Sequence, residues 1–107
     1  MLDTCHVDPI QKKPTVEEQQ TLTTALLAVW GMDCPNCVVR VRNGLLALYG
    51  VVDADIALEL GTTEVLFNPK LTTIPALVST IGRAGGDWEH HYFAVLMGGP
   101  GLVVKHV

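Results

Sequence analysis

Two cysteines three positions apart, Cys34 and Cys37, are the residues of this sequence best suited to chemistry. Their thiolates could hold one soft metal ion between two sulfur atoms. Asp33, immediately before the first cysteine, places a carboxylate oxygen within reach of the same ion. The pair could instead perform thiol–disulfide exchange, or be an inert buried pair, and the elements around it must decide between these interpretations.

Further sulfur and nitrogen ligands lie toward both ends of the chain. Cys5 and His6 are adjacent in a polar N-terminal segment, and His90 and His91 are adjacent before the last apolar run. Successive side chains of a strand point to opposite faces, so at most one of the two histidines could approach a metal loop. We treat all four as possible additional ligands and expect surface side chains at these positions.

The elements that flank the cysteines are a strand and a helix. An apolar run rich in Thr and Val at 22–30 predicts the strand. Apolar residues then recur at helical spacing: Val38, Val41, Leu45 and Leu48. Gly50 is a natural end for this helix. Cys37 would thus lie at a helix N-terminus, where the helix dipole and free N–H groups favour a thiolate.

The next elements form a hairpin. Apolar side chains alternate with Asp53, Asp55 and Glu59 over residues 52–60, which predicts a strand with one wet and one dry face. Gly61-Thr62 would then turn the chain into a second strand at 63–67. These acidic residues are expected on a solvated face rather than in a catalytic pair.

A second helix and a last strand complete the pattern. An apolar stripe at helical spacing follows Thr72 or Thr73, either of which could cap the helix. The stripe consists of Ile74, Leu77, Val78 and Ile81, and the glycines expected to stop it are Gly82, Gly85 and Gly86. Residues 91–97 read as the last strand.

The order strand, helix, strand, strand, helix, strand predicts an α+β, ferredoxin-like βαββαβ sandwich. Both helices would cover one face of an antiparallel four-stranded sheet. We place this domain at residues 21–97, between a flexible leader at 1–20 and a glycine-rich tail at 98–107. Within the leader, Thr15-Val16-Glu17-Glu18 fits a capping box and predicts one helical turn.

Composition excludes several classes of protein. A chain of 107 residues, 49% of them apolar, fits one folded domain, and a net charge of −4 without a Lys/Arg run argues against nucleic acid. No apolar run is long enough to insert into a membrane, and the N-terminus does not resemble a signal peptide. Three cysteines cannot complete a disulfide framework within one chain. We expect a cytoplasmic protein.

The loop Gly31-Met32-Asp33-Cys34-Pro35-Asn36-Cys37 between a first strand and a first helix resembles that of the heavy-metal-associated (HMA) domain family. That family includes copper metallochaperones, mercury-binding proteins and amino-terminal domains of metal-transporting P-type ATPases. The resemblance covers about residues 22–97. It implies that Cys34 and Cys37 are the thiolate ligands, that Met32 packs beneath the loop, and that Ala84-Gly85 ends the second helix.

Two departures from the copper-chaperone pattern bear on the metal. Gly86 follows the Ala-Gly pair, where copper chaperones usually have Tyr or Lys. Asp33 stands where copper proteins often have Thr, Ser or His, and is similar to the pattern in zinc, cadmium and lead exporters. A divalent ion such as Zn²⁺ accepts carboxylate oxygen beside sulfur, so Asp33 as third ligand places a divalent metal slightly ahead of Cu⁺. Asp33 could equally be a solvated loop residue or a helix cap.

The resemblance implies a metal-binding module rather than an enzyme. It would hold one heavy-metal ion and pass it by ligand exchange to a metal-transporting P-type ATPase or a related domain, as a monomer or a metal-bridged dimer. A Cu⁺ metallochaperone of the same fold and a thiol–disulfide redox protein are the alternatives. The split-βαβ order and Gly31-Met32 before the cysteines argue against a thioredoxin-like protein.

Overall fold

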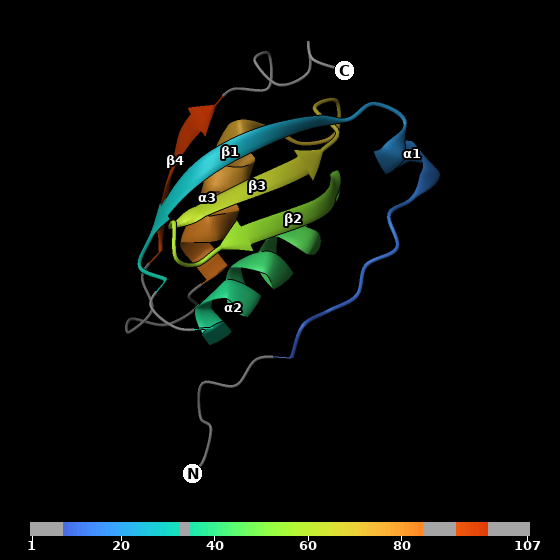
Figure 1. The fold of residues 1–107 in the computed structure, drawn as a ribbon. Helices are drawn as coiled ribbons and strands as arrows, with labels where there is room; N and C mark the ends of the chain where they lie inside the picture. Colours follow the sequence, from blue (N-terminus) through green and yellow to red (C-terminus); the bar gives the residue numbers. More distant parts are fainter. Residues whose placement is uncertain (1–7, 33–34, 85–91, 99–107) are drawn as a thin grey trace.

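The computed structural model describes residues 8–32, 35–84 and 92–98. Its elements are α1 (Val16–Gln19), β1 (Thr23–Trp30), α2 (Pro35–Leu46), β2 (Val51–Ala57), β3 (Thr62–Phe67), α3 (Ile74–Ala84) and β4 (Phe93–Gly98). The four strands form one antiparallel sheet in the order β2-β3-β1-β4, and α2 and α3 cover one of its faces (Figure 1). This is the ferredoxin-like α+β arrangement, so the predicted fold class is confirmed.

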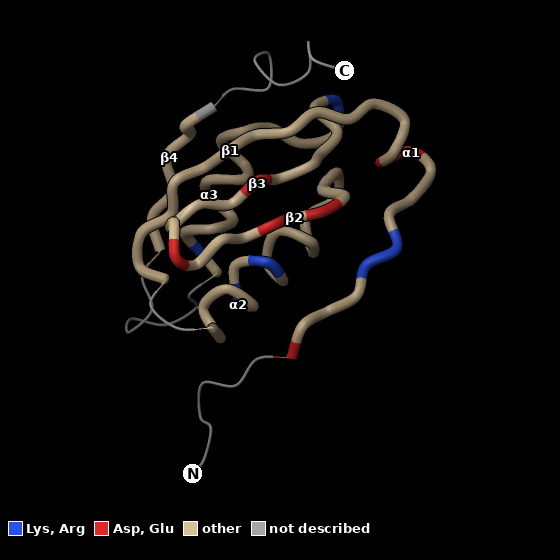
Figure 2. The backbone as a smooth tube through the Cα atoms, viewed as in Figure 1, with Lys and Arg blue, Asp and Glu red and all other residues tan. Residues whose placement is uncertain are grey.

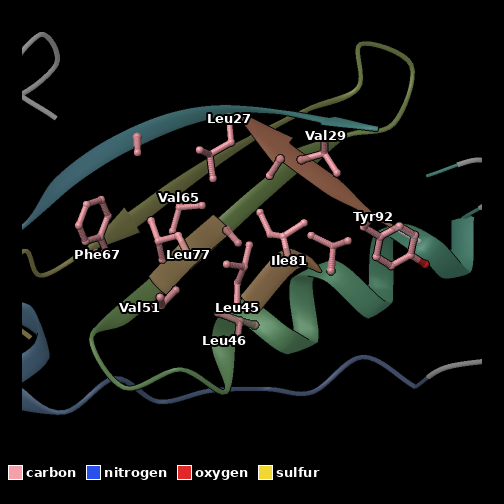
Figure 3. Close-up of a cluster of buried hydrophobic side chains, with 14 of the residues drawn as sticks. Leu27, Val29, Leu45, Leu46, Val51, Val65, Phe67, Leu77, Ile81 and Tyr92 are labelled. Atoms are coloured by element: carbon pink, nitrogen blue, oxygen red, sulfur yellow. The ribbon is translucent and has the colours of Figure 1, made fainter. Parts of the chain in front are cut away.

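The core lies between the sheet and these two helices. Along β1 the buried residues alternate with more exposed ones, because successive side chains of a strand point to opposite faces. Leu27 and Phe67 from the sheet meet Leu45 of α2 and Leu77 and Ile81 of α3, all of them at most 1% exposed (Figure 3). Of the two helical stripes predicted from the sequence, Val41, Leu45, Leu77 and Ile81 are buried against the sheet. Helix α2 ends at Leu46, so the prediction that it runs to Gly50 is wrong, and Leu48 packs against the core from the turn after the helix.

Helix α3 begins at the predicted cap but runs past one predicted stop. The backbone N–H of Ala76 donates to Thr73 Oγ1 at 3.2 Å, so Thr73 is the capping residue. Gly82 lies inside the helix, and the prediction that it ends α3 is wrong. A glycine lowers helix stability by only about 1 kcal/mol, which the buried apolar face of α3 outweighs. Gly85 and Gly86 lie outside the described residues.

The predicted strand at 52–60 is also corrected. Strand β2 ends at Ala57, and Leu60 is 76% exposed in the turn that leads to β3. Val51, rather than Val52, is buried, because the pairing with β3 shifts between Val51 and Asp53. Such a bulge moves one residue to the opposite face, which strict alternation in the sequence does not reveal.

The described part of the leader packs against the domain. The predicted capping box is present: Thr15 Oγ1 accepts from the Glu18 N–H at 3.0 Å, and Glu18 Oε1 accepts from the Thr15 N–H at 2.8 Å. Upstream of α1 the chain passes along α2, where Asn43 holds the backbone of Asp8 and Ile10 (Figure 1). The domain boundary at residue 20 stays a prediction, but residues before it contact the core. No described helix is long and apolar enough to cross a membrane.

Candidate metal centre

The cysteine loop connects β1 to α2, as the sequence predicts. Strand β1 ends at Trp30, and Gly31 adopts a φ of 98°, in the left-handed region that favours glycine. Met32 is partly buried and packs against the core. Helix α2 then begins at Pro35, a residue well suited to a first helical position because its missing N–H would have no partner there.

Cys37 is the candidate ligand whose position the structure describes. It is the third residue of α2 and 0% exposed, and it belongs to the same buried cluster as Val41 and Leu45. It forms no disulfide with another described residue. The free N–H groups of the first helical turn stabilise negative charge on a sulfur placed there. Its apolar neighbours shield that sulfur from water, so an ion bound to Cys37 would be sheltered on this side.

The other candidate ligands lie outside the described residues. These are Asp33, Cys34, Cys5, His6, His90 and His91. Within the described ranges, no group of three or more His, Cys, Asp or Glu side chains could hold a metal ion. The ligand set therefore stays a prediction, and Cys37 is its only member with a described environment.

The orientation of α2 depends on its contact with α3. A Cβ placed on Gly44 would lie 3.5 Å from Ala84 Cβ and 3.7 Å from Thr80 Cγ2, which is ordinary van der Waals contact. Ala84 is the last residue of α3 and is half-buried against the core. A small residue at each of these positions lets the two helices approach closely. Ala84, which the sequence analysis matched to the Ala of the family's Ala-Gly pair, thus packs against α2 at Gly44.

A polar cluster lies just beyond the C-terminal end of α2. The sequence predicted only one part of it, the Thr15–Glu18 capping box of α1. Glu18 is 1% exposed, and its Oε2 accepts from Lys12 Nζ at 2.8 Å and from the Gly50 N–H at 2.6 Å. Lys12 Nζ also donates to the carbonyl oxygens of Leu48 and Val51. The sequence signalled the local Thr15–Glu18 pair, but nothing in it pairs residues 12 and 18 with residues 48–51.

The charge of Glu18 is stabilised in this cluster. Burial raises the pKa of its carboxyl, but the hydrogen bonds from Lys12, Gly50 and Thr15 outweigh this and lower the pKa from 4.5 to about 2. At the exposed edge of the same region, the Tyr49 hydroxyl donates to Glu17, and this hydrogen bond raises the pKa of Tyr49. The cluster is an anchor for the leader rather than a reactive site.

Three carboxylates gather elsewhere, on the sheet face that the helices leave open. Acidic residues lie on the neighbouring strands β2 and β3 (Figure 2). Asp53, Asp55 and Glu64 line a hollow of about 270 Å³ together with Thr24. Asp53 and Asp55 are exposed on β2, as predicted, whereas Glu59, the third residue predicted on this strand face, lies in the turn after the strand. Asp53 lies 3.8 Å from Arg42 Nη2.

Comparisons with known proteins agree with this fold. The heavy-metal-associated domain family matches residues 26–87, more than half of the chain. Copper chaperone CopZ of Staphylococcus saprophyticus is 35% identical over 66 residues, which are 62% of this chain and 97% of the chaperone. Human copper-transporting ATPase 2 is 33% identical over 72 residues, which are 67% of this chain but only 5% of the ATPase. The crystal structure of a copper binding domain from HMA7, a P-type ATPase, has a TM-score of 0.64 at 26% identity, covering 71% of this chain and 95% of that domain.

Proposed function

Because the chain belongs to the heavy-metal-associated domain family, we propose that it binds Cu⁺ through Cys34 and Cys37 and passes the ion to a partner protein. Metal binding and transfer are the roles of the family's chaperones and ATPase domains. The copper-binding relatives favour Cu⁺ as the ion, and the position of Cys37 favours these ligands.

The relatives favour copper over a divalent metal. The chaperone and the human ATPase described above both carry copper in their names, as does the matching domain of HMA7. The sequence alone had put a divalent ion slightly ahead, on the evidence of Asp33. The proposal therefore takes Cu⁺ as the cargo and keeps a divalent ion as the second candidate.

The single observation that carries the proposal is the position of Cys37. Its sulfur lies at the first turn of α2, directly after a loop that Gly31 turns and Met32 anchors. Cu⁺ is a soft ion that accepts a small number of thiolate ligands, so one further sulfur from Cys34 completes a site. A divalent ion wants about four ligands, more than this pair supplies.

Transfer would proceed by ligand exchange without catalysis. A thiolate of the partner binds the ion before a cysteine of this chain leaves, so the ion is never released into water. The partner would be a metal-transporting P-type ATPase or a related metal-binding domain in the cytoplasm. The redox alternative gains no support, because the strand order β2-β3-β1-β4 belongs to a different fold from thioredoxin-like proteins.

Anaerobic competition for Cu⁺ against a chromogenic chelator tests the ligands. We expect Cys34→Ser and Cys37→Ser each to weaken Cu⁺ binding by roughly 100-fold or more, because one sulfur cannot hold the ion alone. Cys5→Ser is the matched control and should leave the affinity unchanged. Since Cys37 is buried, its variant is first checked by circular dichroism, and Cys34→Ser provides the independent result. Wild-type affinity in Cys34→Ser would overturn the proposal.

The second candidate, a divalent metal, is favoured by the carboxylate of Asp33. If Asp33 is a ligand, Asp33→Ala should weaken Zn²⁺ binding by about tenfold and leave Cu⁺ binding unchanged, because Cu⁺ does not need an oxygen ligand. The same titration with Zn²⁺ measures this. An unchanged Zn²⁺ affinity would remove the basis for a divalent preference.

A further inference from the structure

The sheet face opposite α2 and α3 carries side chains that the metal loop does not use. Among the described residues, both long helices pack on one face, and the other face is left open (Figure 1). This open face divides along the strands into two halves of different chemistry. One half is apolar and lies on β1 and β4, and the other is acidic and lies on β2 and β3.

The apolar half is formed by large exposed side chains. Phe93, Val95 and Met97 alternate along β4 and are 62%, 42% and 58% exposed. Trp30, at the end of β1, is 56% exposed, and its ring centroid lies 5.7 Å from that of Phe93 with a 44° tilt. Leu26 continues the same face of β1. Exposed apolar side chains contiguous over two strands are typical of an interaction surface.

The acidic half is formed by the three carboxylates around the hollow. Asp55 of β2 is directly opposite Glu64 of β3 in the register, and Asp53 lies one position further along the same face. Like charges directly opposite on a sheet are destabilising. The described residues include no Lys or Arg in ion-pair contact with Asp55 or Glu64. A cation from outside would relieve this repulsion.

A hydroxyl in the same hollow also lacks a partner. Thr24 lines the hollow from β1, and its Oγ1 is shielded from solvent without a hydrogen-bond partner among the described residues. A buried polar atom without a partner costs about 1–3 kcal/mol, so rotation of the Thr24 side chain toward the hollow, where an incoming group could bond it, would recover part of this free energy. The hollow offers the charge of its carboxylates to an incoming molecule.

The two halves are neighbours and together match the width of a helix. Leu26 of the apolar half is directly opposite Glu64 of the acidic half in the β1–β3 register. Strands lie about 4.8 Å apart, so the four strands span roughly 14 Å between their outer axes. An α-helix with its side chains is about 10–12 Å wide. One helix laid along the strands would contact both halves at once.

We propose that this open face docks a helical segment of a partner protein that is apolar on one side and bears Lys or Arg on the other. The apolar side covers Trp30, Phe93 and Val95, and the basic residues reach Asp55 and Glu64. Charge complementarity selects this occupant, because the chain has a net charge of −4 and a second copy would bring the same carboxylates. The surface goes beyond the proposed function, since it involves none of the candidate ligands.

An NMR titration of the metal-free full chain tests the proposal with a defined probe. The probe is a helical peptide of Leu and Lys, about four turns long, with Leu on one side and Lys on the other. A peptide with Glu in place of Lys is the control. We expect the Leu–Lys peptide to shift amide resonances of β1, β3 and β4 on the open face, with an affinity that falls as salt is added. Shifts confined to other surfaces, or equal binding of the Leu–Glu peptide, would overturn the proposal.

Matched variants locate the contact. Asp55→Asn combined with Glu64→Gln should weaken binding by about threefold to tenfold, as expected for exposed charge pairs, and Val95→Ser should weaken it further. Glu59→Gln in the β2–β3 turn and Val16→Ser on α1 change an exposed carboxylate and an exposed apolar residue elsewhere, and should have no effect. Equal losses in the controls would show non-specific binding and overturn the proposal.

The proposal would also be overturned if the open face were covered by the chain's own C-terminal tail or by a second copy of the chain. The residues after Gly98 include apolar side chains and Lys105, and this tail could occupy the open face itself. In that case deletion of 99–107 would alone shift the open-face resonances and raise the affinity for the probe. A second copy would instead give a dimer in sedimentation velocity that Val95→Ser dissociates. We expect a monomer, and open-face resonances that the deletion leaves unchanged.

Discussion

At the scale of single residues, Glu18 is the described side chain with the largest electrostatic role. It is almost fully buried, and three donors from Lys12, Thr15 and Gly50 hold its charge. Breaking a buried charge pair from one side is destabilising, because the remaining charge loses its partner. The capping-box pattern of Thr15 and Glu18 was readable from the sequence, but the contacts to Lys12 and Gly50 depend on the fold.

Replacing Glu18 by Gln should lower the free energy of unfolding by about 3 kcal/mol at pH 7. The amide keeps the shape of the side chain but leaves Lys12 without its anion. Urea denaturation measures the change. Glu59→Gln, in an exposed turn, is the matched control and should change stability by less than about 0.5 kcal/mol. Equal effects of the two substitutions would contradict the role given to Glu18.

The same carboxylate should make stability depend on acid. Its pKa is about 2 in the folded protein and near 4.5 unfolded, so the unfolded chain binds the proton more readily. The stabilisation is therefore complete above pH 4.5 and is lost as the pH falls toward 2, by roughly 2–3 kcal/mol in total. Unfolding curves of wild type and Glu18→Gln should converge over this interval. Parallel curves down to pH 2 would show that Glu18 is not the group responsible.

At the scale of elements, periodicity predicted which elements form better than where they end. Helices α2 and α3 could be predicted because their apolar residues recur over several turns and face the core, but α2 ends at Leu46 rather than at the predicted Gly50. Strand β2 was extended three residues too far, because Leu58 and Leu60 continue an alternation that the chain leaves after Ala57. The position of Cys37 in α2 followed from the element order, whereas the open-face patch could not be foreseen, since it requires the register of four strands.

Two glycines of different local structure should respond oppositely to alanine. Gly50 has a φ of 104°, and a Cβ there would lie 3.0 Å from Leu71 Cβ and 3.1 Å from Thr72 Cγ2. We expect Gly50→Ala to destabilise the protein by about 2 kcal/mol, from backbone strain and crowding. Gly82, in the exposed part of α3, has room for a Cβ, with its nearest neighbour Tyr92 O at 3.9 Å. Gly82→Ala should stabilise by up to about 1 kcal/mol.

Thermal and urea unfolding of the two variants test this contrast. The comparison is sharp because both substitutions add one methyl group, so they differ in backbone conformation and in packing alone. A gain in stability for Gly50→Ala would mean that the turn before β2 is not held in the left-handed region. A loss for Gly82→Ala would mean that α3 does not continue through residue 82 in solution.

At the scale of the whole molecule, Lys12 and Glu18 of the leader contact the domain just beyond the C-terminal end of α2. Lys12 and Glu18 lie at the C-terminal end of α2, whereas Cys37 lies in its first turn. The helix therefore has its structural anchor at one end and its candidate ligand at the other, which separates stability from metal binding. Substitutions in the leader should accordingly change unfolding without changing the affinity of the metal site.

Removing the leader tests this separation directly. Deletion of residues 1–20 removes Glu18, which accepts from the Gly50 N–H, and Lys12, which donates to the Leu48 and Val51 carbonyls, and we expect it to lower the free energy of unfolding by about 2–4 kcal/mol. Deletion of residues 1–7 is the matched control, because it leaves these hydrogen bonds in place while removing the same Cys5 and His6. The two truncated chains should then bind Cu⁺ with equal affinity, because both keep the loop between β1 and α2.

If the longer deletion left stability unchanged, residues 8–20 would not stabilise the domain, and the sequence-based boundary at residue 20 would also be the structural one. If it instead weakened Cu⁺ binding while the shorter deletion did not, the two ends of α2 would be coupled, and the anchor would act on the metal site through the helix itself.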